Sequence, residues 1–356
     1  MSDSFIVKSS IKNYEVNIIS SLEKHLKDSY RPGDCVIVDK KVIKLHPDLD
    51  LILNSGMKTI AIDSLESTKS YEGVIPFIDE LIKTGFKRNN RLISIGGGIT
   101  QDVTAYIASM LYRGVGWVFF PTTLLAQCDS CIGSKTSINF REFKNQVGGF
   151  YPPISIYIDP NYLKTLTERD IRSGIGEMAH YYFVSGEEDV FYFETEFKEA
   201  LATQENLGEL IRKSLSIKKG YIEIDEFDKK ERIVFNYGHT FGHAIESITN
   251  YGIPHGVAVS FGMDMANYIS MKKGYISNEE VKRAHNVFKV IWEGYSISNL
   301  NLDELFKAME KDKKNENGEF GLILTKGWGK MFKDLTEPDK LFKGWMEEYM
   351  NAYHRN

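Results

Sequence analysis

The residues with the clearest chemical potential are three histidines that lie close together in the second half of the chain. His239 and His243 are four residues apart, so both imidazoles would lie on one face of a helix. His255 follows twelve residues later, at the start of another apolar helical pattern. A lone histidine is usually structural, but clustering favours a shared role. Two imidazoles and an upstream carboxylate would form a three-ligand metal site with an open position, as catalytic Zn²⁺ uses.

A carboxylate suited to that site occurs upstream, in the stretch 173–180. Glu177 follows two glycines in an otherwise apolar helical pattern, where burial of a carboxylate is costly without a cation. His180 is three residues later and shares its face, so it could be an extra ligand, a substrate contact, a partner of Glu177, or a packing residue. Arg232 and Asn236 precede His239 and add groups suited to phosphate or carboxylate recognition.

A glycine-rich turn in the first half predicts an anion-receptive corner. Gly96, Gly97 and Gly98 come directly after an apolar strand pattern and before a helical one. Small residues let backbone N–H groups and the helix dipole approach a phosphate, although a plain tight turn is an equal reading. The spacing is not the G-x-G-x-x-G of the dinucleotide fingerprint. Asp102, one turn into the helix, could be a dipole partner or a polar group facing a cleft.

The segment that follows contains two motifs that resemble known sites and fail their tests. Gly133–Thr136 lacks the Gly directly before Lys that a Walker loop requires, which excludes that ATPase motif. Cys128 and Cys131 have C-x-x-C spacing but no second pair, so small core-filling thiols are favoured over zinc or redox chemistry. A second anion site is indicated by four polar residues among glycines and aromatics: Asp129, Lys135, Lys144 and Asn145.

These residues must be positioned by two different kinds of structure. The first half alternates β-branched runs with helical stretches, which predicts a largely parallel sheet covered by helices. After Asp159 long helical patterns take over. We therefore predict an α/β domain over 1–157 and a mainly helical domain over 158–356, with the active site between them. The expected strands are 35–38, 59–62 and 91–95, and the expected helices are 74–83, 188–202, 206–221, 233–249, 255–273 and 278–291.

Composition excludes several classes of protein. The chain has 356 residues with 44 Lys and Arg against 49 Asp and Glu, a net charge of −5 without a long basic block, so nucleic acid is not an expected partner. Its 3 cysteines are too few for a disulfide framework. No signal-peptide pattern and no apolar run of bilayer length occurs, so we expect a cytoplasmic protein without a membrane partner.

Taken together, the motifs resemble those of 3-dehydroquinate synthase and the related sugar phosphate cyclases, over nearly the whole chain. Because all of these motifs match the family in the same order along the chain, the resemblance is specific. The matching stretches are 66–70, 96–102, 112–115, 121–125, 127–139, 144–151, 163–166, 173–181, 225–226, 238–246, 255–256 and 312–314.

The resemblance implies a Rossmann-like α/β domain followed by a helical domain, a typical homodimer, and two cofactors. The metal, Zn²⁺ or Co²⁺, would be held by Glu177, His239 and His255, while His243 would handle protons. NAD would be bound by Asp39, Glu66, Lys69, Gly97, Gly98, Asp102, Thr122, Thr123, Lys135, Lys144 and Thr165. The sugar phosphate would be held by Asp129, Lys135, Lys144, Asn145, His180, Lys218, Arg232, Asn236 and one of Lys313 or Lys314, with Arg113 reaching the phosphate of the neighbouring subunit.

The resemblance implies a carbon–oxygen lyase that eliminates phosphate from a sugar phosphate. Oxidation of a substrate hydroxyl, elimination of phosphate, reduction, and intramolecular aldol closure would convert 3-deoxy-arabino-heptulosonate 7-phosphate to 3-dehydroquinate, a step of the shikimate pathway to aromatic amino acids. One departure bears on the substrate: typical dehydroquinate synthases have Lys where this chain has His180. Ser134 also replaces a usual Gly.

Three alternatives follow. His180 suggests a related cyclase that forms a 2-deoxy-scyllo-inosose or valiolone-type product. A metal-dependent polyol dehydrogenase would share the domain order and the glycine turn, but it needs no phosphate site of the kind that Lys135 and Arg232 indicate. A non-catalytic homologue is disfavoured because Glu177, His239 and His255 are all present.

Overall fold

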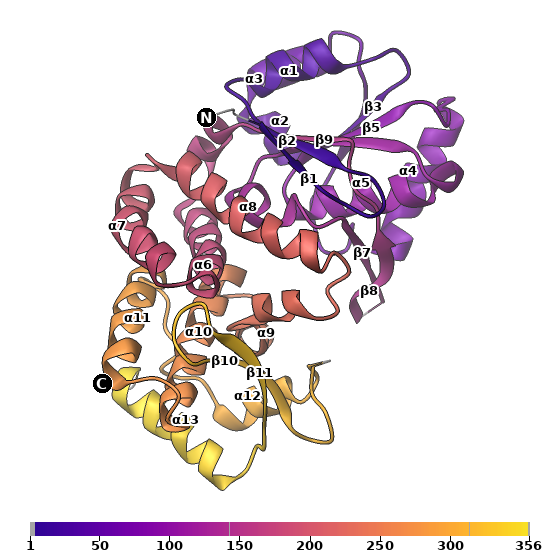
Figure 1. The fold of residues 1–356 in the computed structure, drawn as a ribbon. Coiled ribbons are helices and arrows are strands. Elements are labelled where there is room, and N and C mark those ends of the chain that lie inside the picture. Colours follow the sequence, from indigo (N-terminus) through magenta and orange to yellow (C-terminus); the bar gives the residue numbers. More distant parts are fainter. Residues whose placement is uncertain (1–3, 142, 313, 355–356) are drawn as a thin grey trace. The chain divides into compact units, whose positions relative to one another are not determined.

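The computed structural model describes residues 4–141, 143–312 and 314–354. These residues form two compact units. The α/β unit comprises the described residues up to Leu166 together with Ile222–Phe227. The helical unit comprises Thr167–Tyr221 and the described residues from Asp228 onward. The predicted fold class, an α/β domain with a helical domain, is confirmed (Figure 1).

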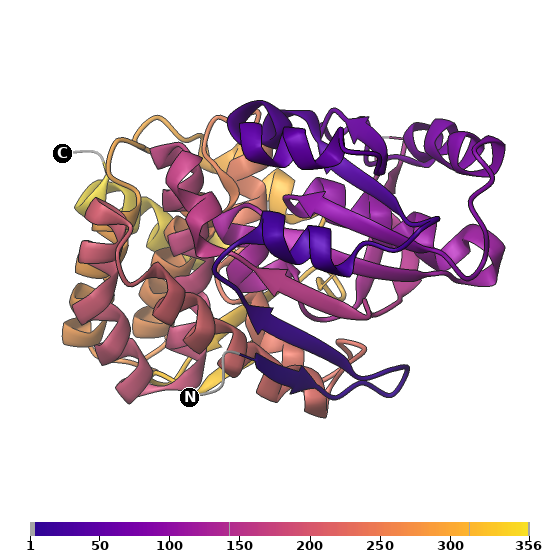
Figure 2. The ribbon, with the colours of Figure 1, turned by 90° about the horizontal axis from the view of Figure 1, so that it is seen from above.

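The α/β unit is built on a seven-stranded sheet with the order β1-β2-β9-β6-β5-β3-β4. All neighbouring pairs are parallel except β1 and β2, which form an antiparallel pair at one edge, seen as indigo arrows in Figure 2. The strands are β1 (Ser4–Val7), β2 (Tyr14–Ile18), β3 (Cys35–Asp39), β4 (Lys58–Ile62), β5 (Arg91–Gly96), β6 (Gly116–Pro121) and β9 (Ser155–Ile158).

Helices cover the two faces because the central strands are apolar on both. Alternate residues such as Val36 and Ile93 form one core cluster with Leu26 and Leu53 of the helices on that face. The helix α5 packs against β3, β5 and β6. The helices are α1 (Leu22–Ser29), α2 (Lys40–Leu45), α3 (Pro47–Leu53), α4 (Tyr71–Lys83) and α5 (Gly98–Met110), and a hairpin is formed by β7 (Lys135–Phe140) and β8 (Phe143–Phe150).

The strand order reverses direction beside β3, since β4 lies on one side of it and β5 on the other. In open parallel sheets, ligands bind outside the carboxyl ends of the strands at such a switch point. Asp39 ends β3 and Gly96 ends β5, so both lie at that edge. Topology therefore marks this edge as the ligand-binding edge of the α/β unit.

The helical unit has two long helices at its centre, α6 (Glu168–Ser185) and α10 (His255–Lys272), and α10 packs along both α6 and α9 (His239–Ile248). A small hairpin, β10 (Phe320–Thr325) with β11 (Met331–Thr336), contacts α10. The remaining helices are α7 (Glu187–Thr203), α8 (Leu207–Ile224), α11 (Asn278–Ile291), α12 (Leu302–Met309) and α13 (Lys340–Tyr353). The end of α8, from Ile222, belongs to the α/β unit.

One predicted helix is wrong in its extent. The expected helix 233–249 is broken into a 3₁₀ turn, η4 (Glu231–Asn236), and α9. The break lies at Gly238, whose φ of 78° is left-handed and where a Cβ would lie 2.6 Å from the carbonyl oxygen of Val259. The chain turns there, so His239 begins a new helix.

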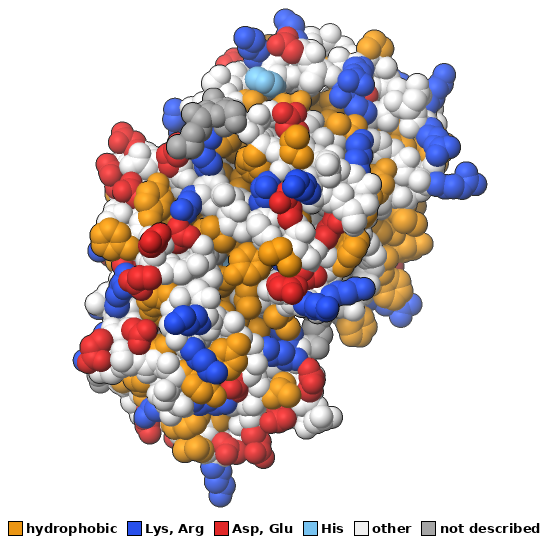
Figure 3. Space-filling model, in the orientation of Figure 1, with side chains coloured by type: hydrophobic (Ala, Val, Ile, Leu, Met, Phe, Trp, Pro, Cys, Tyr) orange, Lys and Arg blue, Asp and Glu red, His pale blue; other side chains and the backbone are white. Residues whose placement is uncertain are grey.

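No described helix has the length and apolarity to span a membrane. Positive, negative and apolar side chains are interspersed over the face shown in Figure 3. This mixture agrees with the nearly equal numbers of basic and acidic residues in the chain.

Candidate active site

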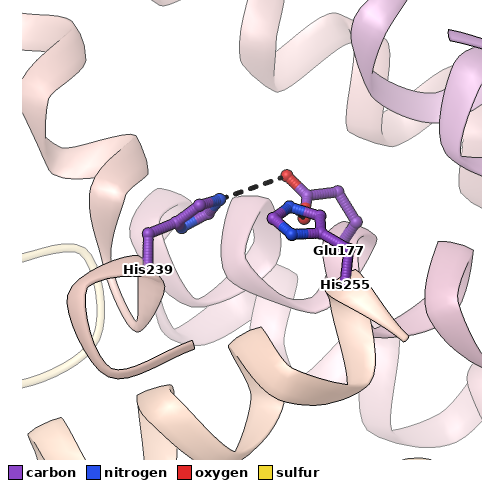
Figure 4. Close-up of side chains that lie close together, drawn as sticks. All are labelled: Glu177, His239 and His255. Atoms are coloured by element: carbon purple, nitrogen blue, oxygen red, sulfur yellow. Dashed lines mark ion pairs between the residues drawn. The ribbon is translucent and has the colours of Figure 1, made fainter. Parts of the chain in front are cut away.

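Three side chains from three helices of the helical unit meet at one point. Glu177 lies in the middle of α6, His239 begins α9, and His255 begins α10. Nε2 of His239 is 3.6 Å from Oε1 of Glu177, and Nε2 of His255 is 3.3 Å from Oε2. Figure 4 shows the three side chains together, with a dashed line from the His239 ring to the Glu177 carboxylate. Possible ligand atoms of these residues all lie within 4.8 Å of one another, which fits a shared metal ion.

The helices reach this closeness through glycines that adjoin the three side chains. A Cβ on Gly176, the residue before Glu177, would lie 2.1 Å from the carbonyl oxygen of Gly256, the residue after His255. A Cβ on Gly262 would lie 2.0 Å from the carbonyl oxygen of Gly238, the residue before His239. Real Cβ contacts are never this short, so only glycine allows these backbones to approach.

The electrostatics of the three side chains are those of a site built for a cation. Burial would raise the pKa of Glu177, but the neighbouring His180 and His239 outweigh it and hold that pKa well below its usual range. Burial would lower the pKa of His255, but hydrogen bonds to Glu177 and Glu246 raise it well above its usual value. Without a metal ion, protonated His255 therefore supplies part of the positive charge beside Glu177.

A buried carboxylate oxygen with one weak contact supports the same reading. Glu177 is 3% exposed, and Nε2 of His255 lies 3.3 Å from its Oε2 without good hydrogen-bond geometry. A buried carboxylate oxygen that is poorly paired is costly, and a cation at this point would remove that cost. Two imidazoles and one carboxylate are also a donor set that Zn²⁺ accepts. The residues present thus fit a divalent metal.

His243 and Lys314 lie beside these three residues. The ring centroid of His243 is 5.4 Å from that of His239 and 5.7 Å from that of His255. Desolvation, His239, His255 and Lys314 together lower the pKa of His243 to about 2, although the residue is exposed. Its ring is therefore neutral at neutral pH. Lys313, predicted as an alternative to Lys314, lies outside the described residues.

His180 is the fourth histidine of this region and the most deeply buried, with 1% exposure. Its Nδ1 is 3.6 Å from Oε1 of Glu177, and its ring meets that of His239 edge to face at a centroid distance of 5.3 Å. The ring also contacts Tyr181 and Phe235. The structure therefore places His180 against the predicted metal ligands as well as in an aromatic cluster.

The same aromatic cluster positions the predicted phosphate-binding cations. Phe235 in η4 contacts Tyr181 and Tyr221, with ring centroids 4.8 Å and 4.6 Å apart. Lys218 on α8 lies with its Nζ 5.9 Å from the Tyr181 ring centroid. Arg232, which is 4% exposed, comes from the same 3₁₀ turn as Phe235. Asn236 ends that turn and donates to the carbonyl of Ile233.

In the α/β unit, the glycine turn forms the predicted open corner. The helix α5 begins at Gly98 with Gly97 as its cap, and no side chain caps its N–H groups. Thr122 donates its backbone N–H to the carbonyl of Gly96, so the ends of β5 and β6 are joined. Its Oγ1 is buried and has no hydrogen-bond partner among the described residues. A Cβ on Gly97 would lie 2.9 Å from Cγ2 of Thr123. These features fit a bound phosphate.

Lys69 and Asp102 form an ion pair beside this corner, with Nζ and Oδ2 2.5 Å apart. Burial raises the pKa of Asp102, and Lys69 opposes that rise. Glu66 accepts a hydrogen bond of 2.8 Å from the side chain of Asn139 on β7. The segment 66–70 is thereby attached to the β7–β8 hairpin, and Ser70 also forms a β-bridge with Asn139.

The hairpin carries the other predicted anion-binding residues. Lys135 begins β7, and Lys144 and Asn145 lie on β8. Asn145 has a φ of 54° and donates its backbone N–H to Oδ1 of Asn139. Asp129 lies in the π-helical turn η2 (Ala126–Ser130). Ser134 has a φ of 62°, a left-handed conformation that explains why glycine suits this position.

Three further predicted residues lie at separate places in the α/β unit. Asp39 caps α2 by accepting from the backbone N–H of Lys41. Thr165 ends the 3₁₀ turn η3 (Pro160–Thr165), and its Oγ1 is 3.1 Å from Nε2 of His46. Arg113 is exposed and follows Tyr112 in a turn where both residues have positive φ.

The cysteines are buried and free, as expected for core-filling thiols. Burial is also the main cause that raises the pKa of Cys35 to about 12, so its thiol is inert at neutral pH.

One neighbour of the site was missed by sequence reasoning. Oε2 of Glu246 on α9 is 2.9 Å from Nδ1 of His255. Glu246 is three residues after His243 and seven after His239, so helical spacing could have placed it on their face.

Comparison with known proteins agrees with this geometry. The family models for the N-terminal and C-terminal domains of 3-dehydroquinate synthase match residues 59–173 and 174–315. The 3-dehydroquinate synthase of Dictyoglomus thermophilum is 38% identical over 328 residues, 91% of each chain. A bifunctional 3-dehydroquinate synthase/phosphatase of Fusobacterium nucleatum is 34% identical over 298 residues, which cover 83% of this chain and 45% of that protein.

Solved structures share the fold. A 2-epi-5-epi-valiolone synthase from Streptomyces hygroscopicus, solved with NAD⁺ and Zn²⁺, has a TM-score of 0.85 at 23% identity and covers 97% of this chain and 99% of its own. A 2-deoxy-scyllo-inosose synthase, solved with carbaglucose-6-phosphate, NAD⁺ and Co²⁺, has a TM-score of 0.82 at 22% identity and covers 98% and 100%. With both domain models matched and the metal-type cluster in place, the chain belongs to the 3-dehydroquinate synthase family of sugar phosphate cyclases.

Proposed function

We propose that this protein is a 3-dehydroquinate synthase that converts 3-deoxy-arabino-heptulosonate 7-phosphate to 3-dehydroquinate and inorganic phosphate. The observation that carries the proposal is the convergence of Glu177, His239 and His255 in a chain of this family. In the reaction, a secondary hydroxyl of the substrate is oxidised to a ketone, and phosphate then leaves by elimination. The ketone is reduced again, and ring opening with aldol closure forms the carbocycle.

A divalent metal, Zn²⁺ or Co²⁺, would be held by Glu177, His239 and His255. When bound, it supplies Lewis-acid support for negative charge on the reacting hydroxyl oxygen. The close packing of the three helices at their glycines would fix these three side chains before substrate binds. Such preorganisation means that little reorganisation is needed during the reaction.

NAD would be held by the α/β unit at the switch-point edge, and when bound it supplies the hydride acceptor and donor. The open N-terminus of α5 and the unpartnered Oγ1 of Thr122 suit its pyrophosphate. The ion pair of Lys69 with Asp102 holds the Lys69 side chain next to that corner. The remaining residues that we assign to this cofactor are Asp39, Glu66, Gly97, Gly98, Thr123, Lys135, Lys144 and Thr165.

The substrate's anionic groups require cations and hydrogen-bond donors. Lys218, Arg232 and Asn236 lie around the Phe235 cluster and would bind its phosphate or carboxylate. His243 is neutral at working pH, so a ring nitrogen with a free lone pair could accept a proton. The other residues that we assign to the substrate are Asp129, Lys135, Lys144, Asn145, His180, Lys314 and, from a neighbouring subunit, Arg113.

A second candidate is a cyclase for a different sugar phosphate. His180, in contact with Glu177, differs from the lysine of typical dehydroquinate synthases and favours this alternative. One experiment separates the two. Purified protein with NAD⁺ and Zn²⁺ is given 3-deoxy-arabino-heptulosonate 7-phosphate, sedoheptulose 7-phosphate or glucose 6-phosphate, and phosphate release is measured.

We expect release from the first substrate, with 3-dehydroquinate as the product. Release from either of the others alone would replace our proposal with the second candidate, and net NADH accumulation with a simple polyol would indicate a dehydrogenase. We further propose a cytoplasmic homodimer in the shikimate pathway, since reduced buried cysteines suit that compartment. Sedimentation velocity would test the dimer.

A further inference from the structure

We infer that Glu246 is a positioning residue that orients His255 toward the metal, an inference that rests on the metal-dependent function proposed above. Oε2 of Glu246 is 2.9 Å from Nδ1 of His255, and the other ring nitrogen, Nε2, is 3.3 Å from Glu177. One imidazole therefore connects the two carboxylates. A ligating histidine commonly donates its second nitrogen to a carboxylate or a carbonyl in this way.

The chemistry of the two carboxylate contacts fixes the tautomer of His255. A metal needs the lone pair of Nε2, so the proton must be on Nδ1. An ionised carboxylate can only accept, and Glu246 therefore favours the proton on the nitrogen that faces it. His239 shows the same arrangement through the backbone, since its Nδ1 is 3.1 Å from the carbonyl oxygen of Tyr237. Both predicted histidine ligands, His239 and His255, thus have a hydrogen-bond acceptor at Nδ1.

His255 has more need of such support than the other two predicted ligands. Its side chain is 31% exposed, against 12% for His239 and 4% for Glu177, so packing restrains it less. It is also the first residue of α10, directly after a loop in which Asn250 and Tyr251 have positive φ. The backbone carbonyl of Glu246 accepts from the N–H of Tyr251 at 2.8 Å. Glu246 therefore holds both the loop and the imidazole that follows it.

A competing role for Glu246 is direct ligation. Glu246, His243 and His255 also have possible ligand atoms within 4.8 Å of one another. In that arrangement His255 would offer its Nδ1 and lose its hydrogen bond to Glu246. The buried carboxylate of Glu177 and the ring of His239 would then take no part in holding the metal. Orientation satisfies both carboxylates at once, so we favour it over direct ligation.

The test is metal binding by the purified full chain in the absence of substrate. Glu246→Gln retains an oxygen that can accept from Nδ1 but removes the charge, whereas Glu246→Ala removes both. Ser247→Ala on the same helix and Glu188→Gln, an exposed carboxylate of α7, are the controls. Affinity for Zn²⁺ and Co²⁺ is measured by chelator competition, the Co²⁺ visible spectrum reports coordination, and thermal unfolding of metal-free protein reports stability.

We expect one metal per chain in all variants, with the dissociation constant raised about 10- to 100-fold in Glu246→Ala and by less in Glu246→Gln. The controls should match the parent protein, and the Co²⁺ spectrum should keep its intensity. Unchanged affinity in both Glu246 variants would overturn the inference. A Co²⁺ spectrum with altered coordination in Glu246→Gln would also overturn it, because Glu246 would then be a ligand. A wrong substrate assignment would leave these binding results unaffected.

Discussion

Gly176 on α6 and Gly256 on α10 bring their backbones together so closely that a Cβ on Gly256 would lie 1.8 Å from the carbonyl oxygen of Ser173. The backbone N–H of Gly256 also donates to Oγ of Ser173 at 3.1 Å. Because Glu177 and His255 adjoin these glycines, the helix crossing sets the distance between two predicted ligands. The spacing of the predicted metal site thus follows from backbone packing.

Gly256→Ala should therefore damage the metal site as well as stability. The added methyl group must push α10 away from α6, which costs about 1–3 kcal/mol for overpacking in a close-packed interior. We expect weaker Zn²⁺ binding together with a lower midpoint of thermal unfolding. Gly344→Ala on α13, a helical glycine where an added Cβ would meet nothing within 4 Å, is the control. Normal metal affinity in Gly256→Ala would show that the crossing does not set the ligand distance.

Substitution of the two histidines of α9 should have different effects on metal content and on activity. His239→Ala removes a predicted ligand and should lose both metal and activity, since two ligands seldom retain a catalytic metal. His243→Ala should keep the metal and lose rate by about 10²–10⁴-fold if the ring transfers a proton. Metal content by elemental analysis and phosphate release are measured on both variants. Normal metal content in both would contradict the ligand assignment.

The positions of these histidines in the structure show which part of the candidate site could be predicted from the sequence. The i, i+4 spacing of His239 and His243 fixes a shared helical face, so local geometry was sufficient. Glu246 required knowledge of where α10 begins in space, because its partner is in another helix. The glycine crossings join residues that are far apart in sequence, such as Gly176 with Gly256, and no local pattern reports them.

Contacts between residues far apart in the sequence also limited the prediction of the fold. Apolar β-branched runs predicted the central strands, because both faces of a covered parallel sheet are apolar. The attachment of Ile222–Phe227 to the α/β unit depends on Glu226, which accepts hydrogen bonds from Ser9 and Ser10 across 217 and 216 residues. The break at Gly238 depends on its approach to α10. Long-range contacts of this kind leave no periodic signal.

Metal affinity should rise with pH through the neutral range. In metal-free protein the pKa of His255 is raised well above its usual value, because its hydrogen bonds to Glu177 and Glu246 outweigh burial. The ring therefore holds a proton that metal must displace, and below that pKa the affinity should fall by up to about tenfold per pH unit. Chelator competition between about pH 6 and 9 measures this slope. A flat profile would mean that His255 is already neutral when the metal arrives.

His180→Lys tests whether the replaced position selects the substrate. A lysine at this buried point would place an ammonium group beside Glu177 instead of an imidazole. If substrate choice has diverged, the variant should shift toward release of phosphate from 3-deoxy-arabino-heptulosonate 7-phosphate relative to the other two sugar phosphates. Tyr181→Phe, which keeps the aromatic contact with Phe235, is the matched control. An unchanged ratio among the three substrates would count against a role in specificity.

Thr122→Val tests the nucleotide corner without disturbing its shape. The Oγ1 of Thr122 is buried and has no partner among the described residues, so its removal should leave the metal-free, NAD-free protein as stable or more stable by roughly 1 kcal/mol. If that hydroxyl binds NAD, the same change should raise the NAD⁺ dissociation constant about tenfold, since a hydrogen bond to a charged group is worth about 1.5–3 kcal/mol. Calorimetry gives the affinity and thermal unfolding gives the stability. Ser94→Ala, whose hydroxyl already donates to the carbonyl of Thr100, is the control and should lower stability without changing NAD⁺ affinity. If Thr122→Val lowered stability and left NAD⁺ binding unchanged, the hydroxyl would serve the fold and not the cofactor.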